Sequence, residues 1–147
     1  MPHNDWLATS QWVVYWHGAP LCWGSRKQKS TSLSSMEAEI IALSEGAKEV
    51  IHLRKFVRGL VPGYSSAPTK LGTDNKAARD LSYNPEHHNR SKHVERRHFF
   101  IRDMVEAQEI IVPLVGTAEN DADFFTKPLA PKRFKFLRRR VMNLSVD

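Results

Sequence analysis

A capped amphipathic helix between Ser34 and Leu60 constrains the fold more than any other feature of the sequence. Ser34 is followed three residues later by Glu37, which is the spacing of a capping box at a helix N-terminus. Val61-Pro62-Gly63 then supplies the residues that end a helix. Between these signals, apolar residues recur at the spacing of one buried helical face: Met36, Ile40, Leu43, Ala47, Val50 and Val57. The rest of the chain must therefore supply the surface that covers this face.

Strand and helix patterns alternate around this helix. Residues 11–23 predict a β-hairpin, because β-branched and aromatic residues flank a turn at His17-Gly18-Ala19-Pro20. The other expected elements are a strand at 70–73, a helix at 75–83, a helix at 91–108, a strand at 110–115, a helix start at 120–125 and a C-terminal helix from Pro131. The pattern predicts an α/β fold, a mixed sheet flanked by helices, in a single domain over residues 1–147. We expect residues 131–147 to form its basic C-terminal helix.

Composition narrows the class of protein. The chain has 147 residues, of which 41% are hydrophobic, so it is not disordered in composition. No apolar run reaches the roughly 18 residues of a membrane span, the N-terminus has no signal-peptide pattern, and Cys22 is the one cysteine. We therefore expect an intracellular protein of the cytoplasm or nucleus, neither secreted nor bound to a membrane.

Basic residues outnumber acidic ones by 22 to 16, which gives a formal net charge of +6. They concentrate at 26–29, 90–102 and 127–140. Such clusters occur on ordinary solvated faces, and they also bind polyanions such as nucleic acids. Both readings stay open on charge alone.

Three carboxylates stand where α/β folds gather their functional sites. Glu37 lies in the first turn of the long helix, Asp74 where a strand runs into a helix, and Asp123 near another helix start. Carboxylates that converge there suit hard divalent cations such as Mg²⁺ or Mn²⁺. The same three residues are equally ordinary as helix caps and as partners of the helix dipole, so spacing leaves both roles open.

Five segments, in order, resemble one known family. They are GAPLCWGSRKQK at 18–29, STSLSSMEAEIIALSE at 30–45, TDNKAA at 73–78, SKHVERRHFFIR at 91–102 and NDADFFTKPL at 120–129. Together they resemble the ribonuclease H domain of copia-type (Ty1/copia) LTR retrotransposon Pol polyproteins, from about Ser10 to Leu144.

The resemblance implies a ribonuclease H-like fold and Mg²⁺- or Mn²⁺-dependent cleavage of the RNA strand in RNA/DNA hybrids. In that family an Asp-Glu-Asp-Asp set binds two metal ions. Glu37 matches the family glutamate, Asp74 the second aspartate and Asp123 the last. The neighbouring Glu39 and Asp121 fall off this pattern, and we expect them to be surface charges.

The first aspartate has no counterpart in this sequence. The family carries it on a central strand ahead of the hairpin, and the matching position here is His3, within an atypical N-terminal segment at 1–9. We expect the loss of this ligand to impair catalysis, and the loss of the strand to expose sheet edges that can pair with another protein chain. Another chain could supply the strand, the sequence could be a truncated copy, or the N-terminus could have been rebuilt.

Candidate nucleic-acid contacts come from the basic segments and the resembling blocks. They are Lys27, Lys29, Asn75, Arg90, Lys92, His93, Lys127, Arg138 and Arg139. An RNA/DNA hybrid is read through its phosphates and 2′-hydroxyls, so basic contacts without base specificity suit it. Two functions remain: a retrotransposon-derived ribonuclease H, whose activity the missing ligand puts in doubt, and a non-catalytic domain of the same origin that binds nucleic acid or a protein partner.

Overall fold

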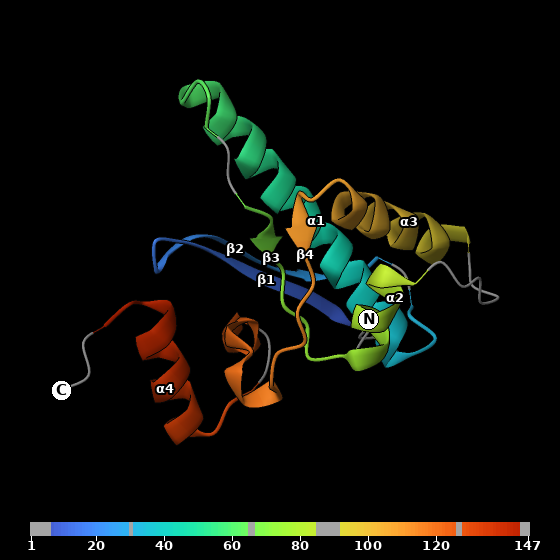
Figure 1. Cartoon of the computed structure of the whole chain (residues 1–147). Coiled ribbons are helices and arrows are strands. Elements are labelled where there is room, and N and C mark those ends of the chain that lie inside the picture. Colours follow the sequence, from blue (N-terminus) through green and yellow to red (C-terminus); the bar gives the residue numbers. More distant parts are fainter. Residues whose placement is uncertain (1–6, 30, 65–66, 85–91, 126–127, 145–147) are drawn as a thin grey trace.

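A computed structural model describes residues 7–29, 31–64, 67–84, 92–125 and 128–144. The mixed α/β fold predicted from the sequence is confirmed, and it has three layers (Figure 1). The hairpin of β1 (Thr9–Trp16) and β2 (Ala19–Lys27) forms the middle layer. The helices α1 (Ser35–Leu60), α2 (Lys76–Tyr83) and α3 (Lys92–Glu106) pack together on one side of it.

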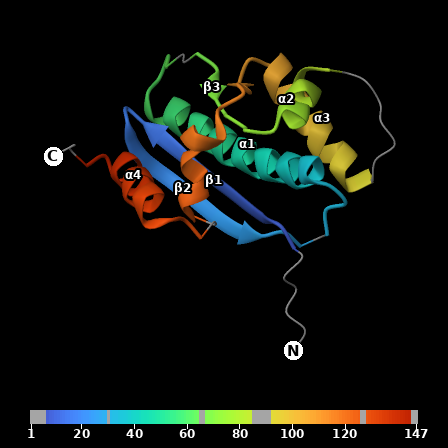
Figure 2. The ribbon, with the colours of Figure 1, turned by 90° about the horizontal axis from the view of Figure 1, so that it is seen from below.

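The opposite side of the hairpin carries the C-terminal part of the chain, as Figure 2 shows in the turned view. The short 3₁₀ helix η2 (Asp121–Phe125) contacts β1, and the helix α4 (Pro131–Val141) packs against η2. Another 3₁₀ turn, η1 (Thr117–Glu119), precedes η2. The predicted helix at 120–125 is thus a 3₁₀ helix rather than an α-helix, a tighter form that is typical of short pieces.

The N-cap predicted for α1 is present, with a shifted form of the capping box in which Glu37 bonds one residue before the cap. The Ser34 hydroxyl accepts the backbone N–H of Glu37 at 3.2 Å, and a carboxylate oxygen of Glu37 accepts the backbone N–H of Leu33 at 2.8 Å. The helix ends at Leu60, as its stop signal predicts. Its apolar face lies in the core with α2, α3 and the strand at Ile110: the buried members on α1 are Ile40, Leu43, Ala47 and Val50. Ile40, Leu43 and Val50 each contribute on the order of 1.5–3 kcal/mol by leaving water, and the smaller Ala47 contributes less.

The hairpin turns at His17 and Gly18, whose φ angles are 49° and 82°. Two consecutive left-handed residues are what the favoured two-residue hairpin turns need, because their twist matches that of the strands. Along the strands, Trp12 pairs with Gly24. A Cβ at Gly24 would overlap the Trp12 ring, so only glycine fits under this buried indole.

A second, parallel pair of strands is formed by β3 (Thr69–Lys70) and β4 (Ile110–Ile111). It continues as a parallel bridge between Thr73 and Leu114. The regular ladder is shorter than predicted at 70–73 and 110–115. Pro113 lacks an N–H, and a proline inside a sheet is typical of an edge strand or a bulge.

Within the described ranges, the four strands form two separate two-stranded sheets. An ion pair ties the far end of α1 to the second sheet: Arg54 Nε lies 2.6 Å from Oε2 of Glu109, next to β4. None of the helices in the described ranges has the length and apolar character needed to cross a membrane.

Candidate functional site

A groove of about 580 Å³ lies between β1 and β3. We call it the β1–β3 groove. One wall comes from Thr9, Gln11, Val13 and Tyr15 of β1, the other from the segment 70–74, and the base from α1. The groove is also lined by Trp12, Ala38, Glu39, Ala42, Leu43, Pro113, Val115 and residues 119–123. Segments far apart in the sequence therefore meet here.

Two of the three predicted metal ligands line this groove. Asp74 follows the bridging residue Thr73 at the end of the β3 segment, and Asp123 comes from η2. Asp123 is 1% exposed. Its Oδ1 accepts a hydrogen bond from Gln11 Nε2 at 3.1 Å, and its Oδ2 accepts one from the Arg133 guanidinium at 3.2 Å. The buried charge is thus compensated, as burial of a carboxylate requires.

Glu37, the third predicted ligand, is not among the residues that line the groove. It is 8% exposed, and its carboxylate serves the capping box through the Leu33 N–H. The sequence left two roles open for Glu37, as a metal ligand or as part of the helix cap. In the structure its carboxylate belongs to the cap of α1.

Glu39 takes the place beside Asp74 and Asp123 instead. Its Oε1 accepts a hydrogen bond of 2.6 Å from the hydroxyl of the fully buried Thr73, the residue before Asp74. The expectation that Glu39 is a surface charge is therefore wrong. Positions two apart on a helix point in nearly opposite directions, so Glu37 and Glu39 cannot both face the groove. The spacing of Glu39 with Ala42 and Leu43, which share one face of α1, was the signal in the sequence.

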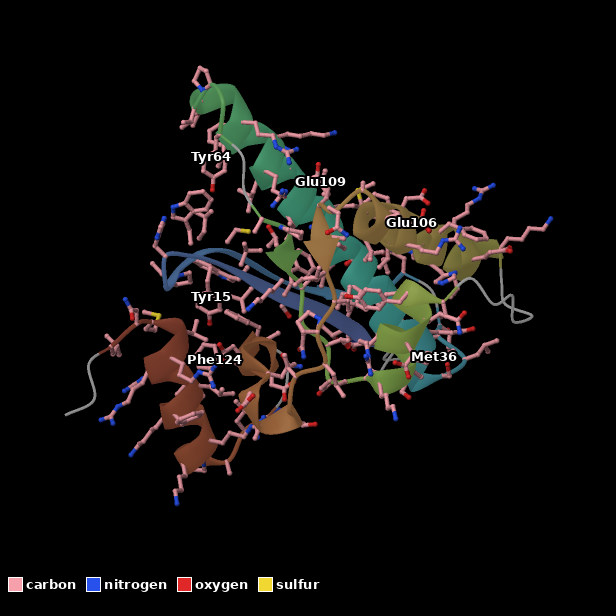
Figure 3. All side chains as sticks on the ribbon, in the orientation of Figure 1. Tyr15, Met36, Tyr64, Glu106, Glu109 and Phe124 are labelled. Carbon is pink, nitrogen blue, oxygen red and sulfur yellow. The ribbon has the colours of Figure 1, made fainter. Side chains whose placement is uncertain are left out.

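Asp121 is also more than a surface charge. Its side chain is 14% exposed, and its Oδ2 accepts a hydrogen bond from the Tyr15 hydroxyl at 3.0 Å. Arg140 Nε lies 3.2 Å from its Oδ1, an ion pair that links α4 to η2. Burial, and then the neighbouring Asp121 carboxylate, raise the pKa of Tyr15 well above its usual value. Figure 3 shows Tyr15 and Phe124 on the same side of the hairpin, toward η2.

Within the described residues, no three Asp, Glu, His or Cys side chains are placed to bind one metal ion. The carboxylates are instead engaged with protein donors: Glu37 with Leu33, Glu39 with Thr73, and Asp123 with Gln11 and Arg133. As placed, these residues do not fit the Mg²⁺ or Mn²⁺ pair that the family resemblance implies.

A second hollow, of about 740 Å³, lies between α4 and the hairpin, and we call it the α4 hollow. It shares Tyr15 and Asp121 with the groove. Its remaining lining comes from the turn at Gly18 and from one face of α4 and the residues after it: Lys132, Lys135, Phe136, Arg139, Arg140, Asn143 and Leu144. Four basic side chains against one carboxylate make it the positively charged counterpart of the groove.

The candidate nucleic-acid contacts have different surroundings. The side chains of Lys27, Lys29, Lys92, Arg138 and Arg139 are exposed, and Arg139 lines the α4 hollow. Asn75 caps α2, with its Oδ1 accepting the Ala78 N–H at 3.0 Å. Arg90, Lys127 and the side chain of His93 lie outside the described residues.

Comparison with known proteins identifies relatives along most of the chain. It is 34% identical over 134 residues, 91% of its length, to the Pol polyprotein of transposon TNT 1-94 from Nicotiana tabacum. It is 32% identical over 138 residues to the Pol polyprotein of transposon RE2 from Arabidopsis thaliana. The chain is homologous to a part of copia-type retrotransposon Pol polyproteins.

This homology covers a small part of each relative. The chain spans about a tenth of the length of these relatives: 10% of the tobacco polyprotein and 9% of the Arabidopsis one. The Gag-Pol polyprotein of yeast transposon Ty1-DR5 is 32% identical over 119 residues. No protein-family model and no solved structure matches the chain.

Proposed function

We propose that the chain is a retrotransposon-derived ribonuclease H-type domain that binds RNA/DNA hybrids. Two observations support the proposal: the homology to Pol polyproteins of copia-type elements, and a mixed α/β fold consistent with a ribonuclease H-like arrangement. The observation that carries the binding function is the α4 hollow, where four cationic side chains surround a cavity open to a polyanion. The partner is a nucleic acid, bound through its backbone phosphates.

The basic side chains of α4 are placed to act together. Lys132, Lys135 and Arg139 follow the three- and four-residue spacing of one helical face. Arg138 and Arg139 are both exposed in the last turn, where the helix dipole favours positive charge. A strip of cations along one helix face follows a phosphate backbone without reading the bases.

The second component of the proposal concerns hydrolysis. The carboxylates on which hydrolysis would depend are Glu39, Asp74 and Asp123, because all three line the groove. Since no three carboxylates in the described residues are placed to bind one metal ion, we expect the chain alone to bind hybrids without cleaving them. Hydrolysis of RNA with Mg²⁺ or Mn²⁺, which the family resemblance implies, would need a more complete set of metal ligands.

Binding is tested by fluorescence anisotropy of a labelled RNA/DNA hybrid over a range of salt concentrations. Replacing Arg138 and Arg139 together by glutamate should weaken binding by at least about tenfold at physiological salt. The same change at Lys48 and Lys55, exposed basic residues of α1, is the matched control and should have a much smaller effect. Equal losses in both double variants would contradict the assignment to α4.

Hydrolysis is tested on the same hybrid with Mg²⁺ or Mn²⁺ at high protein concentration. We expect intact RNA. Cleavage that is abolished by Asp74→Asn or Glu39→Gln, but retained in Glu37→Gln, would show an active nuclease. It would overturn the expectation that the chain alone binds hybrids without cleaving them. A chain that binds no hybrid at low salt would overturn the proposed function as a whole.

A further inference from the structure

Among the described residues, the β1–β3 groove has a backbone hydrogen-bonding edge on each of two opposite walls that pairs with no other described strand. On the β1 side, Gln28 donates its N–H to the Ala8 carbonyl at 2.8 Å. This bond identifies which residues of β1 direct their backbone groups toward β2 and which direct them away. In the antiparallel register, Ser10 and Trp12 then direct their backbone groups toward β2. The alternate residues Thr9, Gln11 and Val13 direct theirs away from β2, and all three line the groove.

The opposite wall shows the same arrangement. The backbone N–H groups of Thr69, Leu71 and Thr73 bond to carbonyls of the β4 segment, at 2.8–3.1 Å. In a parallel ladder the intervening residues point the other way, so Lys70 and Gly72 present their N–H and C=O groups to the groove. Sheet edges of this kind are templates for pairing, and folded proteins normally cover them.

The groove has a distinct chemistry on each of its two faces. On the α1 side the base is formed by Ala38, Ala42 and Leu43, and the two small alanines leave room for bulky apolar side chains. On the other side lie Glu119 and the residues of η2. Five carboxylates and one lysine line the groove as a whole: Glu39, Asp74, Glu119, Asp121, Asp123 and Lys70. Asp121 and Asp123 form ion pairs with Arg140 and Arg133, so the negative charge offered to an occupant comes mainly from Glu39, Asp74 and Glu119.

We propose that the β1–β3 groove receives one extended strand of a second polypeptide, which joins the two sheets into one. The strand has apolar residues at every second position, toward α1, and lysine or arginine at the positions between, toward the carboxylates. Strand addition of this kind gains affinity from main-chain hydrogen bonds and specificity from the alternate side chains. The two walls expose only a few backbone positions each, which suits a strand of the common length of about five or six residues.

This inference does not depend on nuclease activity or on hybrid binding, because neither nucleic acid nor metal takes part in it. The test therefore uses the whole chain alone, with a fluorescent peptide of about ten residues in which valine and lysine alternate. Anisotropy should show saturable binding. Amide hydrogen exchange should slow at Thr9, Gln11 and Val13 and, in the same complex, at Lys70 and Gly72.

Variants and peptides separate strand addition from charge attraction. Ala42→Phe fills the base of the groove and should weaken binding at least about tenfold, whereas Ala77→Phe, on the exposed side of α2, should not. A peptide N-methylated at alternate residues keeps its charge but loses half its donors, and it should bind at least about tenfold more weakly than the parent.

Four results would overturn the proposal. They are no binding of the valine–lysine peptide, slowed exchange on one wall of the groove only, equal affinity of the N-methylated peptide, and tighter binding of a peptide with aspartate in place of lysine. The last result would keep a strand-binding groove but contradict the chemistry assigned to its occupant. Loss of hybrid binding with retained peptide binding would remove the proposed function and leave this inference standing.

Discussion

The β1–β3 groove and the α4 hollow share Tyr15 and Asp121, yet they carry opposite charge. The groove takes its carboxylates from α1, the β3 segment, η1 and η2, so its charge exists only when these elements meet. The hollow takes its basic residues from a single helix at helical spacing. A site built from one helix tolerates change in the rest of the fold, whereas a site built from four elements depends on all of them.

The largest expected effect is on the groove side, at Asp123. Replacing Asp123 by alanine leaves Gln11 and the Arg133 guanidinium without their shared acceptor, so the free energy of unfolding should fall by about 2–3 kcal/mol. Urea denaturation measures this. Asp80→Ala, at an exposed position of α2, should change it by less than about 0.5 kcal/mol. An equally small change at Asp123 would mean that the groove is not a cooperative site.

A smaller effect is expected at Tyr15, which lines both the β1–β3 groove and the α4 hollow. Tyr15→Phe removes the donor to Asp121 and should lower the free energy of unfolding by about 1 kcal/mol near neutral pH. The folded-state pKa of Tyr15 is raised by burial and by Asp121, so its stabilisation is fully present below the unfolded value of about 10 and is lost as pH rises above it. Stability measured from about pH 10 upward should therefore decline more steeply in the wild type than in Tyr15→Phe. Parallel curves would contradict this coupling.

The smallest effect is expected at Glu109, which lies outside the β1–β3 groove and the α4 hollow. Hydrogen bonds from Arg58 and Arg54 lower the pKa of Glu109, so its contribution is present above the unfolded value of about 4.3 and is lost as pH falls below it. Glu109→Gln should cost about 0.5–1 kcal/mol at pH 7 and nothing near pH 2. Thermal unfolding at both pH values tests this, and hybrid and peptide binding at pH 7 should stay unchanged in the variant. A loss of hybrid binding or of peptide binding would show that the α4 hollow or the β1–β3 groove depends on the far end of α1.

Much of the fold could be predicted from local patterns. The capping box at Ser34 and the stop at Pro62-Gly63 gave the bounds of α1, because both signals act through neighbouring backbone groups. The hairpin, α2, α3 and α4 were predicted near their observed positions for the same reason. The two short strands of the second sheet were predicted too long, since only part of each extended segment pairs regularly.

The candidate site was harder to predict. Asp74 and Asp123 do line one groove, although their metal-binding role stays a prediction. Glu39 was assigned to the surface because the resemblance pointed to Glu37, two positions away. The helix rotates by about 200° over two residues, so a shift of this size exchanges the two faces. Asp121 was misjudged because its partners, Tyr15 and Arg140, are distant in the sequence.

Local patterns suffice to predict the long helix, the hairpin and the basic face of α4, since each depends on hydrogen bonds and side-chain spacing within one segment. The packing of distant segments sets which glutamate of α1 faces the groove, which donors hold Asp123, and the gap between the two short sheets. These features depend on the packing of segments separated by up to about a hundred residues, and no local pattern records how such segments meet.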